Sequence, residues 1–295
     1  MKSVLPAAAL LAAALPLGAA CVVVDSQGHI AREEKRFTVA GAPELHLTTF
    51  DGSIEIRSGD AKTVVVEIEK RGPTQEALAQ LKVETKQDGN RIDVEVRKPA
   101  GGDVVLFGIG HSSPTARLIV TMPREGNVVA RSGDGSVRIE HVHGSLDLRT
   151  GDGSIRGIDV GGTLSVQTGD GSVTLEDAEG DLDVNTGDGS VSVSGKLGAL
   201  RLHTSDGSIT LRADRGTTMK DDWSLSTGDG GVAIYLPPDF AAEVDAHTGD
   251  GSVRSELDIA SDGESSRRSL KGKLGAGGKV LKIRTGDGSI RLKQS

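Results

Sequence analysis

A short phrase, Thr-Gly-Asp-Gly-Ser followed by Val or Ile, returns along this 295-residue chain and constrains its fold more than any other feature. The phrase or a close variant of it contains Asp51, Asp134, Asp152, Asp170, Asp188, Asp206, Asp229, Asp250 and Asp287. The members from Asp134 to Asp206 follow one another at intervals of 18 residues. A fixed period of this length predicts a repeat architecture. Repeat proteins mostly present surfaces, whereas catalysis requires a local cluster of unlike groups.

Each repeat combines two short runs of alternating residues with two turns. In the unit that begins at Asp152, Ile155 follows the Asp-Gly-Ser turn, and Leu164 and Val166 alternate with polar residues after Gly162. Alternation with a period of two predicts strands. We expect the glycines around the aspartate to adopt positive φ, and the aspartate to accept a hydrogen bond from the backbone N–H two residues on.

Two arrangements of these strands fit the pattern, an antiparallel meander and a parallel β-solenoid with one coil per 18 residues. In a solenoid, equivalent positions stack about 4.8 Å apart, so each column selects one residue type. Two columns are uniform in this way: Ser136, Ser154, Ser172, Ser190 and Ser208, and Thr150, Thr168, Thr186, Thr204, Thr227, Thr248 and Thr285. The sequence therefore favours an all-β fold, a parallel β-solenoid resembling a β-helix. Its predicted core is the inward aliphatic set Val137, Ile139, Leu146, Leu148, Ile155, Leu164, Val166, Val173, Leu175, Leu182, Val184, Val191, Val193, Leu200 and Leu202.

The N-terminus has the pattern of a secretory signal over residues 1–20, with Lys2 ahead of an apolar run and small residues at its end. Cys21 is the only cysteine, and its position resembles a bacterial lipobox, in which the cysteine becomes the acylated first residue. Gly18 stands where that pattern prefers Leu, so ordinary cleavage before Cys21 remains the alternative. Residues 21–36 then read as a tether.

The remaining chain, residues 37–295, is predicted to be one solenoid domain, with a non-repeat β elaboration at 57–125 and the repeat array at 126–295. The elaboration is expected to cap the first coils, because solenoids need protected ends. Its predicted elements are a strand at 63–69, a short helix capped by Thr74 and ending at Gln80, a hairpin over 83–96 turning at Asp88-Gly89, a loop at 100–114 and a strand at 116–122.

The formal net charge of −8 argues against nucleic acid or anionic lipid as the main partner, since both need a positive surface. A small basic segment around Arg267 and Arg268 is interpreted as a solvated loop. No cofactor is predicted.

The repeated carboxylates have two interpretations. In the first, Asp134, Asp152, Asp170, Asp188 and Asp206 are structural turn residues. In the alternative they bind calcium, as in nonapeptide β-rolls, which carry two aspartate-bearing turns per coil. The second turn of this chain, near Gly144, Gly162, Gly180 and Gly198, lacks a fixed carboxylate, which favours structural turns. His141 and His143 could share a strand face, but no third metal ligand lies near them in sequence.

The repeated phrase, the segment Leu236-Pro237-Pro238-Asp239-Phe240, the stretch 242–253 and the ending from Gly277 to Ile290 together resemble a bacterial family of envelope proteins labelled "putative adhesin", formally a domain of unknown function. The likeness covers residues 40–295 and implies a β-solenoid exported to the cell envelope, with no established reaction.

These observations predict a non-enzymatic envelope protein, a scaffold or adhesin-like surface for an unknown envelope or surface ligand, anchored to a membrane through Cys21. Without acylation it would be periplasmic or secreted. The alternative function is a calcium-binding β-roll adhesin, and a polysaccharide-active β-helix enzyme ranks below it. An enzyme is not expected, because an acid–base pair needs differentiated environments and these aspartates occupy equivalent turns.

Overall fold

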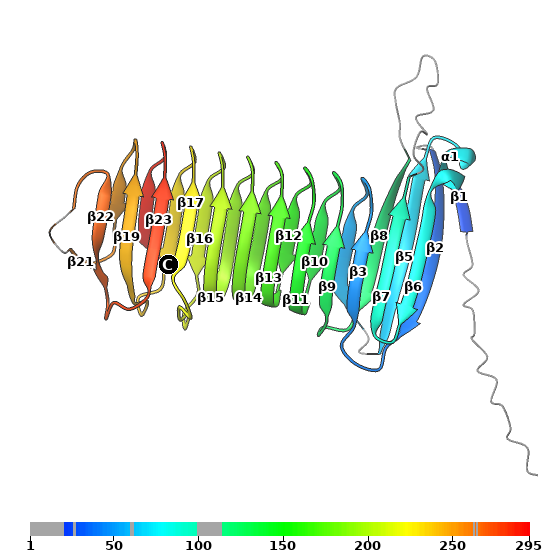
Figure 1. Cartoon of the computed structure of the whole chain (residues 1–295), viewed down its shortest axis with the longest axis horizontal. Coiled ribbons are helices and arrows are strands. Elements are labelled where there is room, and N and C mark those ends of the chain that lie inside the picture. Colours follow the sequence, from blue (N-terminus) through cyan, green and yellow to red (C-terminus); the bar gives the residue numbers. More distant parts are fainter. Residues whose placement is uncertain (1–20, 26–27, 60–61, 99–113, 262, 264) are drawn as a thin grey trace, which may run out of the picture.

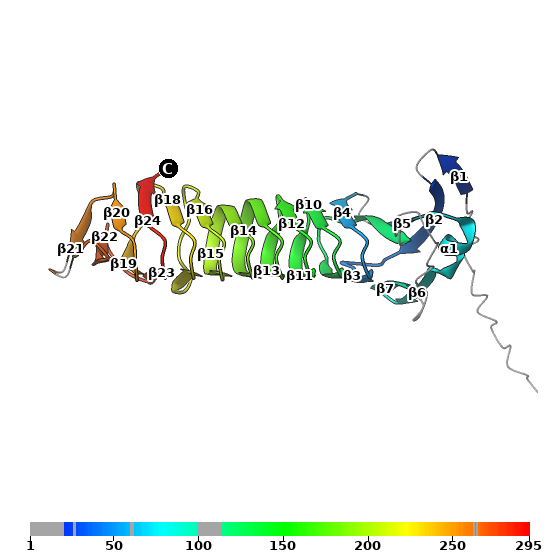
Figure 2. The same cartoon turned by 90° about the horizontal axis from the view of Figure 1, so that it is seen from above.

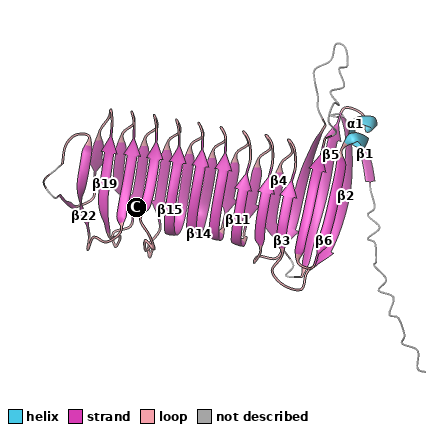
Figure 3. Cartoon of the chain, viewed as in Figure 1, coloured by secondary structure: helices cyan, strands magenta, loops and turns pink. Residues whose placement is uncertain are grey.

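The computed structural model describes residues 21–25, 28–59, 62–98, 114–261, 263 and 265–295, and these residues are mostly β-strand (Figures 1 and 3). Two walls of strands face each other along an elongated stack (Figure 2). The prediction of an all-β fold with mostly parallel pairing is thus confirmed. The predicted signal segment 1–20 and nearly all of the predicted loop 100–114 lie outside the described residues.

The first wall contains, in spatial order, β6 (Lys82–Asp88), β7 (Arg91–Arg97), β3 (Glu44–Thr48), β9 (Asn127–Arg131), β11 (His143–Arg149), β13 (Gly161–Thr168), the second halves of β14 (Val173–Thr186) and β15 (Val191–Thr204), β17 (Trp223–Thr227), β23 (Val280–Thr285), β19 (Ala242–Thr248), β22 (Ser269–Leu274) and β21 (Ile259–Ser261).

The second wall contains β1 (Cys21–Asp25), β2 (Gly28–Thr38), β5 (Thr63–Gly72), β8 (Thr115–Met122), β4 (Ile54–Ser58), β10 (Val137–Glu140), β12 (Ile155–Ile158), the first halves of β14 and β15, β16 (Ile209–Ala213), β18 (Val232–Leu236), β24 (Ile290–Gln294) and β20 (Val253–Ser255). Strands β14 and β15 run through both walls and join them.

Strand register brings equivalent residues of successive repeats together. Val137 pairs with Ile155, Ile155 pairs with Val173, and Val173 pairs with Val191, all in parallel strands. The side chains of the predicted inward set are buried between the walls, each no more than 4 % exposed. This burial follows from the period-two alternation, because alternate side chains of a strand point to opposite faces.

Aromatic side chains occupy places where the regular spacing is lost. Trp223 follows the last 18-residue interval and is fully buried, with its ring centroid 5.3 Å from that of Phe240. Its Nε1–H donates to the Gly198 carbonyl at 2.7 Å. The indole therefore fills space inside the longer coils without leaving its polar atom unpaired.

Antiparallel pairing is confined to the two ends of the stack. At one end β5 pairs with β2 and β8, and β6 with β7, while at the other end β22 pairs with β19 and β21. The elaboration agrees with its predicted elements. The helix α1 (Gln75–Gln80) begins at Thr74, whose side chain accepts a bond from Ala77 N, and the β6–β7 hairpin turns through Gly89 at a φ of 60°.

Residues 21–36 differ from the expected tether, because they form β1 and most of β2. Strand β2 pairs with β5 from His29–Gly72 to Thr38–Thr63. Charged residues along β2 find partners on the neighbouring strand: Arg32 contacts Glu69 at 2.7 Å, and Lys70 contacts Glu33 at 3.0 Å. Polar composition suggested a tether, but cross-strand ion pairs suit this sequence to the edge of a sheet.

The last coil in sequence is not the last in space. Strand β23 lies between β17 and β19, and β24 lies between β18 and β20. The chain after β20 forms β21 and β22 at the end of the stack and then returns to fill the adjacent position (Figure 1). The segment around Arg267 and Arg268, interpreted from sequence as a solvated loop, is therefore followed directly by a capping strand, β22.

Candidate functional site

The repeated turns form a continuous ladder that the buried threonines hold together. Thr186 Oγ1 donates to the carbonyl oxygens of Gly169 at 3.2 Å and Gly171 at 3.0 Å, both in the preceding coil. Thr168 and Thr204 repeat the same pair of contacts one coil earlier and one coil later. Since the Thr186 side chain is only 1 % exposed, these bonds are shielded from competing water.

The threonine hydroxyls also close the turns in which a bond to the aspartates was predicted. Gly207 N donates to Thr204 Oγ1 at 3.1 Å, and Gly230 N donates to Thr227 Oγ1 at 3.2 Å. The turn is thus closed by a threonine ahead of the aspartate. The prediction that the aspartate accepts from the N–H two residues on is wrong at these turns, because no hydrogen bond within the described chain reaches the side chain of Asp206 or Asp229. The threonine accepts instead from the N–H that directly follows the aspartate.

The glycines of the ladder are required because a Cβ would clash with the neighbouring coil, and not because the backbone adopts positive φ. None of the glycines that flank Asp134, Asp152, Asp170 and Asp188 is among the described glycines with positive φ, contrary to the prediction. A Cβ on Gly171 would lie 2.1 Å from the Gly153 carbonyl oxygen, and one on Gly189 would lie 2.1 Å from that of Gly171. Adjacent coils approach so closely that only hydrogen fits between their backbones.

The five aspartates of the regular ladder, Asp134, Asp152, Asp170, Asp188 and Asp206, are exposed along one edge of the stack. Consecutive members lie in the turns that precede adjacent parallel strands, about 5 Å apart. Within the described part of the chain, no group of three or more His, Cys, Asp or Glu side chains could hold a metal ion. No ion pair is found for these five carboxylates within the described residues, so the ladder is a row of like charge on a hydrogen-bonded backbone.

Replacing one aspartate tests this view. Asp170→Asn is expected to raise the free energy of unfolding by up to about 1 kcal/mol at low salt, because it removes repulsion from two neighbours. The gain should shrink in 0.5 M salt, where screening is stronger. Urea unfolding followed by Trp223 fluorescence measures both. A loss of about 1 kcal/mol, the scale of a broken side-chain bond, would contradict the assignment to repulsion.

The second turns carry two carboxylates, Asp159 and Asp177, that the sequence interpretation missed. His141, Asp159 and Asp177 occupy equivalent positions with φ of 58°, 49° and 53°. A residue at positive φ is often Asn, Asp or His, which would have been the available signal. The turn glycines Gly144 and Gly162 lie just beyond, also at positive φ.

His141, His143 and Asp159 form a charged cluster with Arg124. His141 Nδ1 lies 2.9 Å from Asp159 Oδ2, and His143 Nε2 lies 3.3 Å from Asp159 Oδ1. Arg124 Nη2 lies 3.0 Å from both Asp159 Oδ2 and His143 Nε2. The contact with His141 lowers the pKa of Asp159, with His143 and Arg124 adding to the effect and burial opposing it. A guanidinium inside the cluster makes it an ion-pair network and disfavours a cation there.

The lowered pKa predicts the pH dependence of this network. A carboxyl whose pKa is depressed on folding contributes stability above its unfolded pKa of about 3.9 and loses it as pH falls through the folded value. Asp159→Asn should therefore cost up to about 1 kcal/mol at pH 7, typical of exposed pairs, and nothing once Asp159 is protonated. Asp177→Asn, at the equivalent turn, is the matched control and should be neutral at both pH values. Equal losses at pH 7 and below pH 3 would contradict the prediction.

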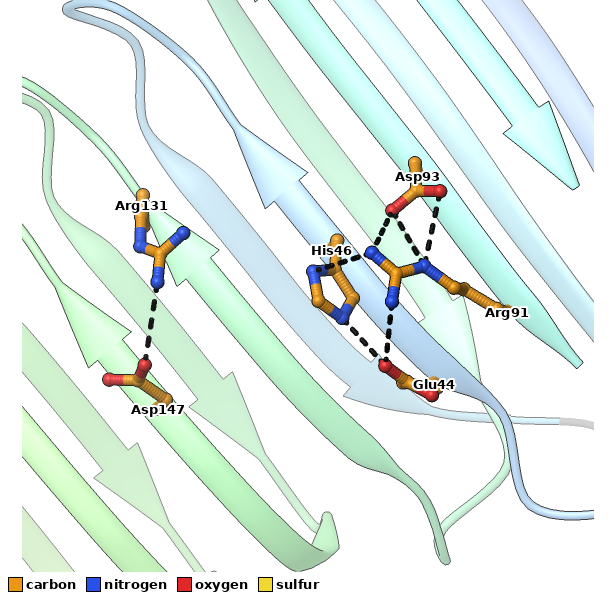
Figure 4. Close-up of polar contacts among 6 residues, drawn as sticks. All are labelled: Glu44, His46, Arg91, Asp93, Arg131 and Asp147. Atoms are coloured by element: carbon orange, nitrogen blue, oxygen red, sulfur yellow. Dashed lines mark hydrogen bonds and ion pairs between the residues drawn. The ribbon is translucent and has the colours of Figure 1, made fainter.

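The outer face of the first wall carries charge pairs both within and between strands (Figure 4). Arg91 donates to Asp93 at 3.1 Å and to Glu44 at 3.3 Å, and His46 Nε2 lies 2.9 Å from the same Glu44 oxygen. Further along this face, Arg131 and Arg149 both contact Asp147, at 3.8 Å and 2.8 Å. These groups neutralise one another in pairs, a pattern typical of a stable solvated surface.

Two open hollows of modest size lie on the surface of the stack. One, of about 290 Å³, lies beside the Asp51 turn and includes Arg71 and Arg117, and the other, of about 210 Å³, lies between β19 and β22 and includes Asp245 and Lys271. Cys21 is the first residue of β1, with Arg32 of β2 as its register partner. The structure thus places Cys21 at the end of the stack away from the aspartate ladder.

Stacked coils, buried hydroxyl ladder and paired outer faces define a β-solenoid-like protein. Residues 42–293 match the family model described as "Toastrack DUF4097", so the chain belongs to this family of unknown function. No curated protein matches the sequence.

Solved structures with weak similarity were found. A "putative lipid binding protein" from Parabacteroides distasonis is 15 % identical, covers 88 % of this chain and 96 % of its own, and has a TM-score of 0.49. A "putative adhesin" from Bacteroides fragilis is 11 % identical, with coverages of 90 % and 97 % and a TM-score of 0.40. A "putative cell adhesion protein" from Clostridium sporogenes is 14 % identical, with coverages of 90 % and 100 % and a TM-score of 0.29. At these scores no function is carried over.

Proposed function

We propose that this protein is a non-enzymatic envelope protein whose outer strand faces bind an envelope or surface ligand. The observation that carries the proposal is the organisation of the side chains. The coils are held by repeated backbone and threonine contacts, which leaves two long faces of outward side chains free to vary. Repeat architectures of this kind commonly function through such extended surfaces.

The arrangement of the described carboxylates supports a binding role. The carboxylates of Figure 4 are engaged by arginines, and the ladder aspartates occupy equivalent turns. General acid–base chemistry needs two groups whose environments push their pKa values apart. Asp159, whose pKa is lowered, is held in an ion-pair network on a turn, and Asp245, whose pKa is also lowered, is paired with Arg284.

We further propose that the protein is exported and held to a membrane by acylation of Cys21. The apolar run ahead of Cys21 and the small residues next to it support this proposal. Strand β1 lies at the end of the stack opposite the capping strands β21 and β22 (Figure 1). An anchor there would let the stack project from the bilayer. None of the helices in the described residues is long and apolar enough to span a membrane.

Metabolic labelling tests the anchor. Cells that express the full chain should incorporate labelled palmitate into the protein, and Cys21→Ser should abolish the label and release the protein from membranes. An unlabelled wild-type protein recovered entirely in soluble fractions would exclude acylation and leave only ordinary secretion. A pull-down from envelope fractions with the purified protein would then identify the ligand.

A calcium-dependent adhesin is the second candidate, and the exposed aspartate ladder is the observation that favours it. Bound calcium would contribute directly to folding. On this hypothesis 1 mM calcium raises the melting temperature of the wild type by several degrees, and Asp170→Asn reduces the rise. If the turns are structural, calcium and a chelator both leave the melting temperature unchanged.

A further inference from the structure

The C-terminal segment of the chain has the opposite charge balance to the remainder. Residues 253–295 contain ten Lys and Arg against five Asp and Glu, although the whole chain contains 34 against 42. This segment supplies β20, β21, β22, β23 and β24, which lie together at one end of the stack (Figure 2). The acidic protein therefore has one basic end.

On the second wall these cations form a compact group on the outer face. Arg291 of β24 is the register partner of Arg254 of β20, and Lys293 of β24 is the register partner of Tyr235 of β18. Tyr235 is in turn the partner of Arg212 of β16, whose guanidinium carbon lies 4.4 Å from the ring centroid. We call these five residues the basic face. Strand spacing makes it about 14 Å across, and its two rows are about 7 Å apart.

The pairing of charges changes along this wall. Nearer the middle, Arg138 lies beside Glu140 and Arg156 contacts Glu176 at 2.8 Å. In the basic face, Lys293 contacts Glu256 at 3.5 Å, whereas Arg254 and Arg291 have no acidic partner among the described residues. Both arginines are exposed. Like charges in register repel, so an anion shared between the two guanidiniums would relieve a cost built into the free protein.

The chemistry of the face specifies the anion. Guanidinium groups bind carboxylates and phosphates through paired N–H donors, and the Tyr235 ring holds the Arg212 guanidinium on this face by stacking against it. The charges are spread in two short rows along the stack, which fits a chain of anionic groups better than one small ion. The inner side chains of these strands, such as Ile234 and Leu292, are buried, so the face has little apolar surface to enter a bilayer.

We infer that the basic face, Arg212, Tyr235, Arg254, Arg291 and Lys293, is a binding site for a linear acidic polysaccharide. A polymer strand can follow the narrow face, whereas an anionic bilayer is wide enough to meet the acidic remainder of the protein and be repelled. The inference deepens the proposed binding function and rests on it, but it is independent of the anchor at Cys21.

Binding by the purified protein, expressed as the full chain and processed by the cell, tests the inference. The probes are immobilised polygalacturonate, neutral dextran, vesicles with 30 mol % phosphatidylglycerol, and a single-stranded oligonucleotide. The protein should bind polygalacturonate, with an affinity that falls as salt rises from 50 to 300 mM. It should leave dextran unbound.

Two double variants separate the site from net charge. Arg254→Gln with Arg291→Gln should weaken polygalacturonate binding about tenfold, as expected when two charge-assisted contacts are lost. Arg138→Gln with Arg156→Gln removes the same charge from the same wall and should change it less than twofold. Both variants should keep the wild-type circular dichroism spectrum.

Equal losses in the two double variants, or no binding to polygalacturonate, would overturn the site. Preference for the vesicles or the oligonucleotide would overturn the choice of polysaccharide. These outcomes can be distinguished from failure of the proposed anchor. If the anchor proposal is wrong, the wild-type protein incorporates no palmitate but still binds polygalacturonate. Failure of the proposed binding role as a whole would instead yield no specific partner in the envelope pull-down.

Discussion

Gly189→Ala is expected to destabilise the protein by about 3 kcal/mol or more, enough to prevent folding in a marginally stable domain. The added Cβ would lie 2.1 Å from the Gly171 carbonyl oxygen and 2.5 Å from its carbon. Both are backbone atoms of the neighbouring coil, so a side-chain rotation cannot relieve the clash. The coils would have to separate, breaking the parallel pairing of β14 and β15 on either side of the turn.

Gly231→Ala is the matched control for this substitution. Gly231 belongs to the same ladder but stands in the column that holds serine in other coils, and its nearest neighbour to an added Cβ is the Ser289 oxygen at 3.4 Å. The variant should unfold within about 0.5 kcal/mol of wild type. Urea denaturation followed by circular dichroism measures both variants. A folded Gly189→Ala protein of wild-type stability would show that the coils are not closely stacked.

Thr186→Val should lower the free energy of unfolding by about 1–3 kcal/mol, the range for a buried acceptor left without its donor. Valine preserves the shape of the side chain but removes the hydroxyl that donates to Gly169 O and Gly171 O. Because the position is 1 % exposed, water cannot replace the lost donor without opening the turn. Urea denaturation gives the loss directly.

Thr174→Val controls for the change of residue type. Thr174 lies in the same strand, β14, but points outward and is half-buried, and it makes no side-chain hydrogen bond among the described residues. This variant should be neutral within about 0.5 kcal/mol. Equal losses at the two positions would mean that the threonine column contributes through strand propensity and not through hydrogen bonds.

Periodicity made the architecture of the repeats predictable. Val137, Ile155 and Val173 recur at one interval, and the structure pairs them in parallel as the uniform Ser and Thr columns indicated. The local signals in the elaboration were equally direct, since Thr74 caps its helix and Gly89 closes its hairpin. Each of these features depends on neighbours in sequence or on one repeated contact.

The roles within the turn were harder to assign, because they depend on contacts between coils. From sequence, the Asp-Gly pair has the composition of a turn in which glycine supplies positive φ and aspartate accepts a bond. The structure gives the hydrogen bonds to Thr204 and its equivalents, and it requires Gly171 because of the Gly153 carbonyl. A column of buried threonines was visible in the sequence, but its donor function needed the adjacent coil.

Two features near the ends of the stack, the strands formed by residues 21–25 and 28–36 and the position of β23, were not predicted, for a related reason. Residues 29–36 pair with β5, 29 to 43 residues further along the chain, and β23 lies between β17 and β19. Polar composition is typical of a tether, and sequence order suggests that the last coil lies at the end. The positions of these segments depend on which strands they pair with, and the partner strands are distant in sequence.

The distance between Asp134 and Asp206 tests the parallel stack most directly. Four successive strand pairings, β10–β12, β12–β14, β14–β15 and β15–β16, separate the two turns. Nitroxide labels are attached at Asp134→Cys and Asp206→Cys in a Cys21→Ser background. The distance between them, measured by pulsed electron–electron double resonance, should be about 19 Å, which is four strand spacings. An antiparallel meander would place equivalent turns two strands apart and give about 38 Å, which would contradict the stacked-coil account.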